Sequence, residues 1–245
     1  MGMINYFEKE MPVAASQCDY AGNLSVRAVF DIFMDAASEH AALLGVGYYD
    51  MLRQHCYWVA ARTRVKMHKP APMWRNVTVQ TWPTAPTAVK CDRCYRIVCG
   101  DELIAEGRTE WAVQDTETGR LRRTDSIGYP QIEHRRELVC EDKFARFPNI
   151  VSDGAQLFGR YTVTSSDIDV GAHMNNVAYI RMLMGLFSVQ ELRDKPVKEM
   201  EIAYRLGCFE GEALSVYRRD EPDGAAVLQI NKPDGTAAAH ARIVR

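Results

Sequence analysis

The sequence lacks the features that mark membrane-spanning and exported proteins. No apolar run approaches the roughly 18 residues that a membrane-spanning helix needs. Residues 1–10 show no charged-then-apolar pattern of the kind that begins a signal peptide. The seven cysteines are odd in number and irregularly spaced, which indicates reduced thiols rather than a disulfide framework. We therefore expect a cytoplasmic protein without a membrane span.

An excess of positive charge is also missing. The 30 Lys and Arg residues and 32 Asp and Glu residues give a net charge of −2, which argues against general nucleic-acid binding. Some cations are nevertheless grouped: Arg62, Arg64, Lys66 and Lys69; Arg120, Arg122 and Arg123; Arg135 and Arg136. Such groups are usually solvated faces, and the alternative is a docking surface for an acidic partner.

The cysteines offer little for metal chemistry. Cys91 and Cys94 form a Cys-x-x-Cys pair, but no second pair stands at a comparable spacing, so a zinc site is not expected. The stretch Val89–Val98 alternates polar and apolar residues, which predicts a strand with packed thiols. We expect no metal and no cofactor.

The chain repeats itself at an offset of 150 residues. Residues 19–30 match residues 169–180 in the order of acid, small pair, polar and apolar positions, and each copy leads into a segment of helical period. The first predicted helix carries apolar residues at spacings of three and four from Val26 to Leu44 and ends at Gly45. The second is predicted over Asn176–Leu192.

Strands are predicted after the first helix and on both sides of the second. The predicted segments are Tyr57–Met67, Val77–Trp82, Val89–Val98 and Leu103–Val113 in the first half, and Leu157–Thr164, Val197–Leu206, Ala213–Arg218, Ala225–Ile230 and Ala237–Val244 in the second. Pro222–Gly224 and Pro233–Gly235 predict hairpin turns. One helix and a run of strands in each half favour an α+β protein with each sheet wrapped around its helix. We predict domains at 1–123 and 150–245, joined by a linker at 124–149 that carries a short helix.

Residues 167–176 hold the densest group of chemically active side chains. The run contains two acids, His173 and the adjacent amides Asn175 and Asn176, directly before the second predicted helix. A helix N-terminus favours developing negative charge, so this segment can stabilise an oxyanion. Capping of the helix explains Asn175 alone but not the other residues.

This motif and its surroundings resemble the acyl-acyl-carrier-protein thioesterases. That family carries a pattern close to Asp-x-Asn-x-His-Val-Asn-Asn-x-x-Tyr, which stands here as Asp-Val-Gly-Ala-His-Met-Asn-Asn-Val-Ala-Tyr over residues 169–179. The first half adds residues 40–45, the Trp-Val-x-x-Arg stretch at 58–62 and the Thr81–Trp82 pair. The resemblance implies two tandem hotdog folds that release fatty acid from acyl carrier protein. It also implies an acyl pocket in the first half, with Phe30, Phe33 and Met34 as candidate lining residues.

Thioester hydrolysis needs an activated water or nucleophile and a stabilised oxyanion, and residues of the second half can supply both. His173 is the candidate general base, Asp169 orients its ring, and backbone N–H groups at Asn175 and Asn176 hold the oxyanion. Cys208 is a candidate nucleophile, with a buried packing role as the alternative.

Two positions depart from the family pattern. Gly171 stands where the family has asparagine, and Gly207 stands where it has an acid before the cysteine. Glu210 lies an odd number of residues from Gly207, so on a strand it would face the opposite side of the sheet and could not replace that acid.

Three functions follow from these residues. The first is hydrolysis of acyl-carrier-protein thioesters, with the acidic carrier protein docking on an arginine group. The second is a non-catalytic acyl-binding protein, favoured by Gly171 and Gly207. The third is hydrolysis of acyl-coenzyme A. Pairing of two chains as a homodimer is compatible with each of them.

Overall fold

The computed structural model describes residues 5–245. The chain divides into two compact units, Met1–Asp142 and Lys143–Arg245, and each is described by itself. None of the helices in the described residues combines the length and apolar character that crossing a bilayer requires.

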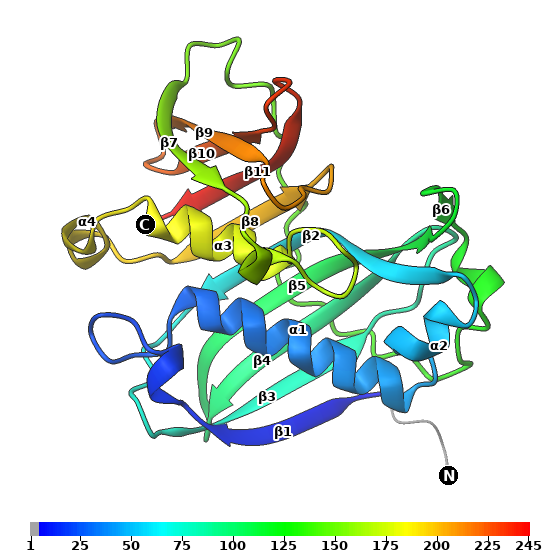
Figure 1. The fold of residues 1–245 in the computed structure, drawn as a ribbon. Coiled ribbons are helices and arrows are strands. Elements are labelled where there is room, and N and C mark those ends of the chain that lie inside the picture. The colour runs from blue at the N-terminus through cyan, green and yellow to red at the C-terminus, as the bar shows by residue number, and fades with distance from the viewer. Residues whose placement is uncertain (1–4) are drawn as a thin grey trace. The chain divides into compact units, whose positions relative to one another are not determined.

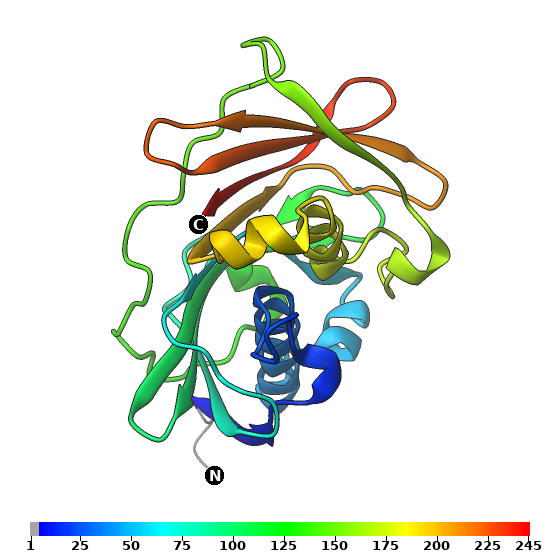
Figure 2. The ribbon, with the colours of Figure 1, turned by 90° about the vertical axis from the view of Figure 1, so that its left-hand side faces the viewer.

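The first unit is an antiparallel sheet with one long helix. Its strands are β1 (Phe7–Pro12), β2 (Cys56–Met67), β3 (Asn76–Pro83), β4 (Cys91–Cys99), β5 (Glu102–Asp115) and the short β6 (Leu121–Arg122), and its helices are α1 (Val26–Leu43) and α2 (Tyr48–Leu52). The strands lie in the order β1-β3-β4-β5-β2, with β6 paired to β5. Helix α1 lies in the curve of this sheet (Figures 1 and 2).

Helix α1 forms where the sequence predicts it, for reasons that are visible at both ends. The hydroxyl of Ser25 accepts the backbone N–H of Ala28 and caps the first turn. Gly45, with a φ of 72°, provides the left-handed conformation that follows the last turn. The apolar face packs closely on β5, because a Cβ atom on Gly107 would lie only 2.6 Å from the Phe33 ring. Glycine at 107 therefore sets how near the helix approaches.

The stretch after β6 is held along the sheet of the first unit. It begins with a short 3₁₀ helix, Thr124–Ile127, and residues 128–149 contain no helix or strand. The indole of Trp82 donates to the Glu137 carbonyl at 2.9 Å, and Arg108 donates to the Asp142 carbonyl at 2.9 Å. Arg96 adds an ion pair to the Glu137 carboxylate at 2.7 Å. The part of the predicted linker that reaches Asp142 is thus fixed to the first unit.

The second unit repeats this plan with shorter helices. It contains β7 (Gln156–Thr162), α3 (Asn176–Gly185), α4 (Val189–Asp194), β8 (Glu199–Tyr204), β9 (Ala213–Asp220), β10 (Ala226–Asn231) and β11 (Ala237–Val244), with strand order β8-β11-β10-β9-β7. All neighbouring strands within this unit are antiparallel. The two Pro-Asp-Gly turns connect β9 to β10 and β10 to β11, as predicted. The α+β class is confirmed.

Two predicted elements of the second unit are wrong in detail. The continuous helix over Asn176–Leu192 is interrupted, because α3 ends at Gly185 and the Ser188 side chain caps a separate helix, α4. The strand predicted over Val197–Leu206 ends at Tyr204. Gly207 and Cys208 therefore lie in the β8–β9 loop, and the alternation argument against Glu210 does not apply there.

Candidate active site

The same loop precedes the long helix in both units. In the first unit, the Asp19 carboxylate accepts the N–H of Ala21 at 2.8 Å, and the Asp19 N–H donates to the Asn23 carbonyl at 2.7 Å. In the second unit, the Asp169 carboxylate accepts the N–H of Gly171 at 2.8 Å. The Asp169 N–H donates to the His173 carbonyl at 3.1 Å.

The flanking elements keep the same register. The 3₁₀ helices Ala15–Gln17 and Ser165–Asp167 and the helices starting at Val26 and Asn176 are each 150 residues apart. The repeat seen in the sequence is therefore a repeat of local backbone structure.

His173 lies at the centre of the second loop. Its Nδ1 is 3.7 Å from Oδ1 of Asp169, with both side chains about 30% exposed (29% and 30%). That separation is an ion-pair distance and exceeds a normal hydrogen bond. Asp169 is itself fixed by the Gly171 N–H and by the Asn175 amide, whose Nδ2 donates at 3.4 Å. The carboxylate thus lies on the Nδ1 side of the imidazole and leaves Nε2 as the nitrogen directed away from it.

The two adjacent asparagines differ in what they do. Asn175 caps α3, since its Oδ1 accepts the Val177 N–H at 2.8 Å and its own N–H donates to the Asp167 carbonyl at 2.8 Å. Its polar groups are therefore committed to local structure. The N–H of Asn176, in contrast, has no hydrogen-bond acceptor among residues 5–245. It is the first N–H of α3, where the helix dipole favours a negative ligand.

The two glycines that depart from the family pattern both face His173. A Cβ atom on Gly171 would lie 2.8 Å from Cε1 of His173 and 3.1 Å from Oδ1 of Asp169. A Cβ atom on Gly207 would lie 3.5 Å from Cβ and Cδ2 of His173, an ordinary contact. The imidazole therefore occupies the space that a side chain at 171 would need, whereas position 207 has room.

Cys208 lies in a setting that suppresses its reactivity. The residue is fully buried, and burial raises the pKa of its thiol above the usual value. The Tyr179 hydroxyl is its hydrogen-bonding neighbour. Its carbonyl accepts the Met174 N–H at 2.7 Å, which ties the β8–β9 loop to the His173 loop. A neutral thiol is a poor nucleophile.

Asp167 is a structural residue of the site to which sequence reasoning gave no separate role. Its buried carboxylate accepts hydrogen bonds from the Tyr161 hydroxyl and from the Thr164 N–H, each at 2.8 Å. It also pairs with the Arg181 guanidinium. Burial would raise the pKa of Asp167, but these hydrogen bonds and the arginine charge outweigh it, so the pKa is lowered. In the sequence, the Asp-x-Asp spacing of Asp167 and Asp169 is the feature that could have indicated a role for Asp167.

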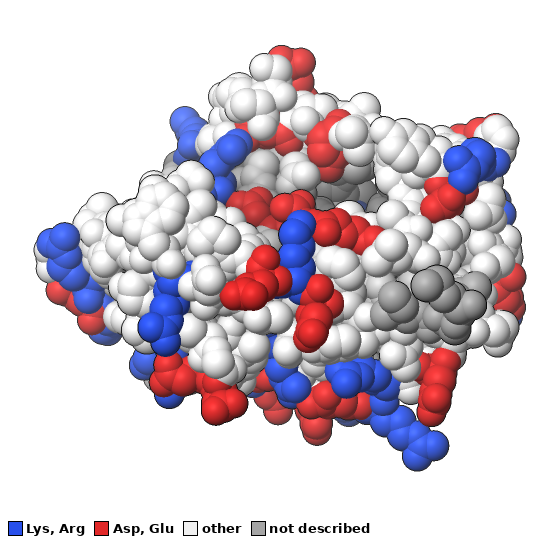
Figure 3. All heavy atoms as spheres, turned by 90° about the horizontal axis from the view of Figure 1, so that it is seen from below, with Lys and Arg blue, Asp and Glu red and all other residues white. Residues whose placement is uncertain are grey.

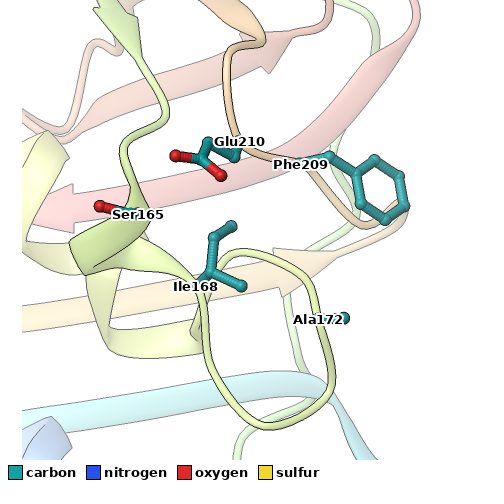
Figure 4. A pocket seen from close by; sticks show the side chains of 5 residues that line it. All are labelled: Ser165, Ile168, Ala172, Phe209 and Glu210. Atoms are coloured by element: carbon teal, nitrogen blue, oxygen red, sulfur yellow. The ribbon is translucent and has the colours of Figure 1, made fainter.

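A pocket of about 550 Å³ opens beside the His173 loop (Figure 4). It is lined by Ser165, Ile168, Ala172, Phe209 and Glu210. The loop that carries Phe209 and Glu210 is held by Lys232, whose ammonium donates to the Gly207 carbonyl at 2.9 Å and pairs with Glu212 at 2.9 Å. Glu210 thus lines the same pocket as Ala172, the residue next to His173. Within residues 5–245, no group of three His, Cys, Asp or Glu side chains is arranged to hold a metal ion.

Family models match both halves of the chain in order. The model described as acyl-ACP thioesterase N-terminal domain matches residues 4–127, and the model described as acyl-ACP thioesterase C-terminal domain matches residues 151–243. The oleoyl-acyl carrier protein thioesterase of Coriandrum sativum, named as chloroplastic, is 23% identical over a match covering 88% of this chain and 63% of that protein. A chloroplastic palmitoyl-acyl carrier protein thioesterase of Arabidopsis thaliana is 24% identical, with coverages of 85% and 53%. The chain thus spans between about half and two thirds of the length of these relatives.

Solved structures share the fold over nearly the whole chain. An acyl-ACP thioesterase from Bacteroides thetaiotaomicron superposes with a TM-score of 0.85 at 19% identity, covering 98% of this chain and 97% of that one. The 12:0-ACP thioesterase from Umbellularia californica superposes with a TM-score of 0.83 at 18% identity, covering 97% and 96%. The predicted fold of two tandem hotdog repeats is confirmed.

Proposed function

Because this chain belongs to the acyl-ACP thioesterase family, we propose that it hydrolyses fatty acyl-acyl carrier protein and releases the free fatty acid. The observation that supports this most directly is the placement of His173 and Asp169 together at the start of α3 in the second repeat. We further propose that the reaction serves fatty acid synthesis in the cytoplasm.

In this proposal, His173 activates water. Asp169 lies on the Nδ1 side of the ring and favours the tautomer with its proton on Nδ1. Nε2 then accepts a proton from water as the water oxygen attacks the thioester carbonyl carbon. The carbonyl oxygen becomes an oxyanion, and the N–H of Asn176 is the donor available to it. Collapse of this tetrahedral intermediate breaks the carbon–sulfur bond and expels the carrier thiolate, which takes the proton from His173.

Cys208 has a structural role in this mechanism. Its raised pKa and full burial favour the neutral thiol, so attack by water is preferred to a covalent acyl-cysteine. Asn175 positions Asp169 and caps α3 rather than contacting substrate.

Not every arginine group is suited to dock the carrier protein. Arg64 is only 5% exposed and donates to the Asp142 carbonyl, so reversing its charge would test folding rather than docking. On the face drawn in Figure 3, acidic and basic side chains lie interspersed. Arg120 and Arg136 are exposed and are better candidates. If either contributes, its replacement by Glu raises KM for carrier-protein thioesters and weakens the salt dependence of KM.

A panel of acyl-carrier-protein thioesters, from butyryl to stearoyl, tests the proposed activity. We expect turnover by the wild type and a loss of about 100-fold or more in kcat for His173→Ala, the size expected for removal of a general base. Asn23→Ala is the matched control, because Asn23 holds the equivalent loop position in the first repeat, and it should retain activity.

Three results would contradict parts of the proposal. Intact thioesters throughout the panel, with acyl chains bound tightly, would favour the acyl-binding alternative that Gly171 and Gly207 support. Equal activity of His173→Ala would remove the base assignment. Faster cleavage of coenzyme A thioesters carrying the same chains would move the substrate to acyl-coenzyme A.

A further inference from the structure

The interior of the first unit contains a buried cation without an acidic partner. Arg93, on the face of β4 that meets α1, is 6% exposed. Its Nη1 lies 2.9 Å from Nδ1 of His40 and 3.4 Å from Oγ1 of Thr81. Within residues 5–245, no Asp or Glu side chain pairs with it. An arginine is always charged and is rarely buried without an anion.

The groups around Arg93 supply no negative charge. Burial raises the pKa of Tyr95 to about 12, which the charge of Arg93 offsets only in part, and burial also raises the pKa of the Cys91 thiol. Both groups are therefore neutral near neutral pH. The His40 imidazole and the Thr81 hydroxyl carry no negative charge and are fully buried. The guanidinium thus keeps an uncompensated charge.

Aromatic and apolar surfaces surround this charge. Tyr95 stacks on Phe33 of α1 with ring centroids 4.7 Å apart, and His40 stacks on Phe7 at 5.9 Å. The face of α1 that carries Phe33 is the one predicted to line the acyl pocket. A ligand that fits here would combine an apolar chain with an anionic end.

Arg108 is a second buried arginine of the same sheet and serves as a comparison. It is also 6% exposed but lies on the opposite face of the sheet. It donates to the Asp142 carbonyl at 2.9 Å, and its charge helps to lower the pKa of the Asp142 carboxyl. The two arginines are equally buried, but the charge of Arg108 acts on a carboxyl group, whereas no carboxylate pairs with Arg93 among the described residues.

We propose that Arg93, with His40 and Thr81, forms a subsite in the first unit that binds the carboxylate of an acyl-derived ligand. This rests on the proposed function and on the expectation, drawn from the family resemblance, that the first unit holds the acyl chain. A guanidinium donates paired N–H groups to a carboxylate, which supplies the missing countercharge. The carboxylate has two possible sources: a released fatty acid bound with its head inward, or the far end of a dicarboxylic acyl chain.

Binding to the His173→Ala protein tests this without depending on turnover. Decanoate, decanol and sebacate are compared by calorimetry in four backgrounds: Arg93 intact, Arg93→Met, Arg93→Lys and Arg108→Met. With Arg93 intact, we expect at least one carboxylate to bind 10-fold or more tightly than decanol. Arg93→Met should abolish that preference, Arg93→Lys should keep part of it, and the matched control Arg108→Met should keep all of it if it folds.

Thermal unfolding separates a ligand site from a structural arginine. Without ligand, Arg93→Met should unfold at the same temperature as its parent or higher, because it removes an uncompensated buried charge. Sebacate-specific binding would indicate a dicarboxylic chain, and decanoate binding would indicate the released product. The subsite is overturned if no carboxylate binds better than decanol, or if Arg93→Met and Arg93→Lys both keep the full preference. Hydrolysis by the wild type is measured separately, so failure of the subsite and failure of the thioesterase activity remain distinguishable.

Discussion

At the residue scale, the position of the His173 ring depends on the absence of a side chain at 171. A Cβ atom on Gly171 would lie only 2.8 Å from Cε1 of His173, which is shorter than real Cβ contacts. The Gly207 side of the ring has ordinary contact distances instead. The two departures from the family pattern are therefore physically different: one makes room that the imidazole uses, and the other leaves room beside it.

This difference predicts unequal effects of adding one methyl group. Gly171→Ala should displace the imidazole from Asp169 and lower kcat/KM by about 10-fold or more, since misplacing a catalytic group is costly. Gly207→Ala should change kcat/KM by less than about 3-fold, or about 0.6 kcal/mol. Steady-state kinetics on one carrier-protein thioester checks both. Similar losses in the two variants would show that the observed ring position is not the catalytic one.

At the scale of elements, the two loops before the long helices use one backbone conformation with different residues. The left-handed position is Gly22, φ 75°, in the first unit and Ala172, φ 61°, in the second. Alanine in this conformation costs roughly 1–2 kcal/mol. The strained residue directly precedes His173, which agrees with the tendency of strain to collect at functional sites.

Replacing each of these residues by the type found at the other position tests whether the backbone strain at Ala172 is present. Ala172→Gly should stabilise the protein by about 0.5 kcal/mol, since relief of strain exceeds the added freedom of the unfolded chain. Gly22→Ala should destabilise it by about 0.5–1 kcal/mol, because no atom lies within 4 Å of its new Cβ and only the backbone term remains. Urea unfolding measures both changes. A destabilised Ala172→Gly would argue against strain at this loop.

At the scale of the whole molecule, a buried histidine makes the free energy of unfolding depend on pH in the acidic range. His240 on β11 is 3% exposed, stacks on Phe147 and accepts a hydrogen bond from Arg205 at Nδ1. Burial, aided by the Arg205 charge, lowers its pKa to about 4. The unfolded chain takes up this proton at about pH 6.5. Between these values the unfolded state binds more protons, so stability falls as the pH falls.

Replacing His240 should flatten this dependence. From pH 7 to 4.5, the wild type should lose about 2 kcal/mol more unfolding free energy than His240→Gln, because one pKa unit corresponds to about 1.4 kcal/mol. His55→Gln serves as the control, since the His55 side chain is 72% exposed, and it should follow the wild type. Parallel pH profiles for all three proteins would rule out His240 as the source.

Much of the fold could be predicted because its signals are local. The apolar spacing from Val26, the Ser25 cap and Gly45 define α1 within a few neighbouring residues, and the Pro-Asp-Gly turns define two hairpins. The break between α3 and α4 was missed because apolar periodicity continues past Gly185. The end of β8 at Tyr204 was missed because hydrogen bonding to β11, rather than residue preference, ends that strand.

The amino-acid sequence by itself determined the repeat, the α+β class, the family and the segment from Asp167 to Asn176, because each depends on residue types at short spacings. The tertiary structure decided which groups in that segment meet. It buries the Cys208 thiol, brings Gly207 to His173, and leaves Arg93 without an acid. These depend on contacts between residues distant in the chain, whose distances and burial no local pattern encodes.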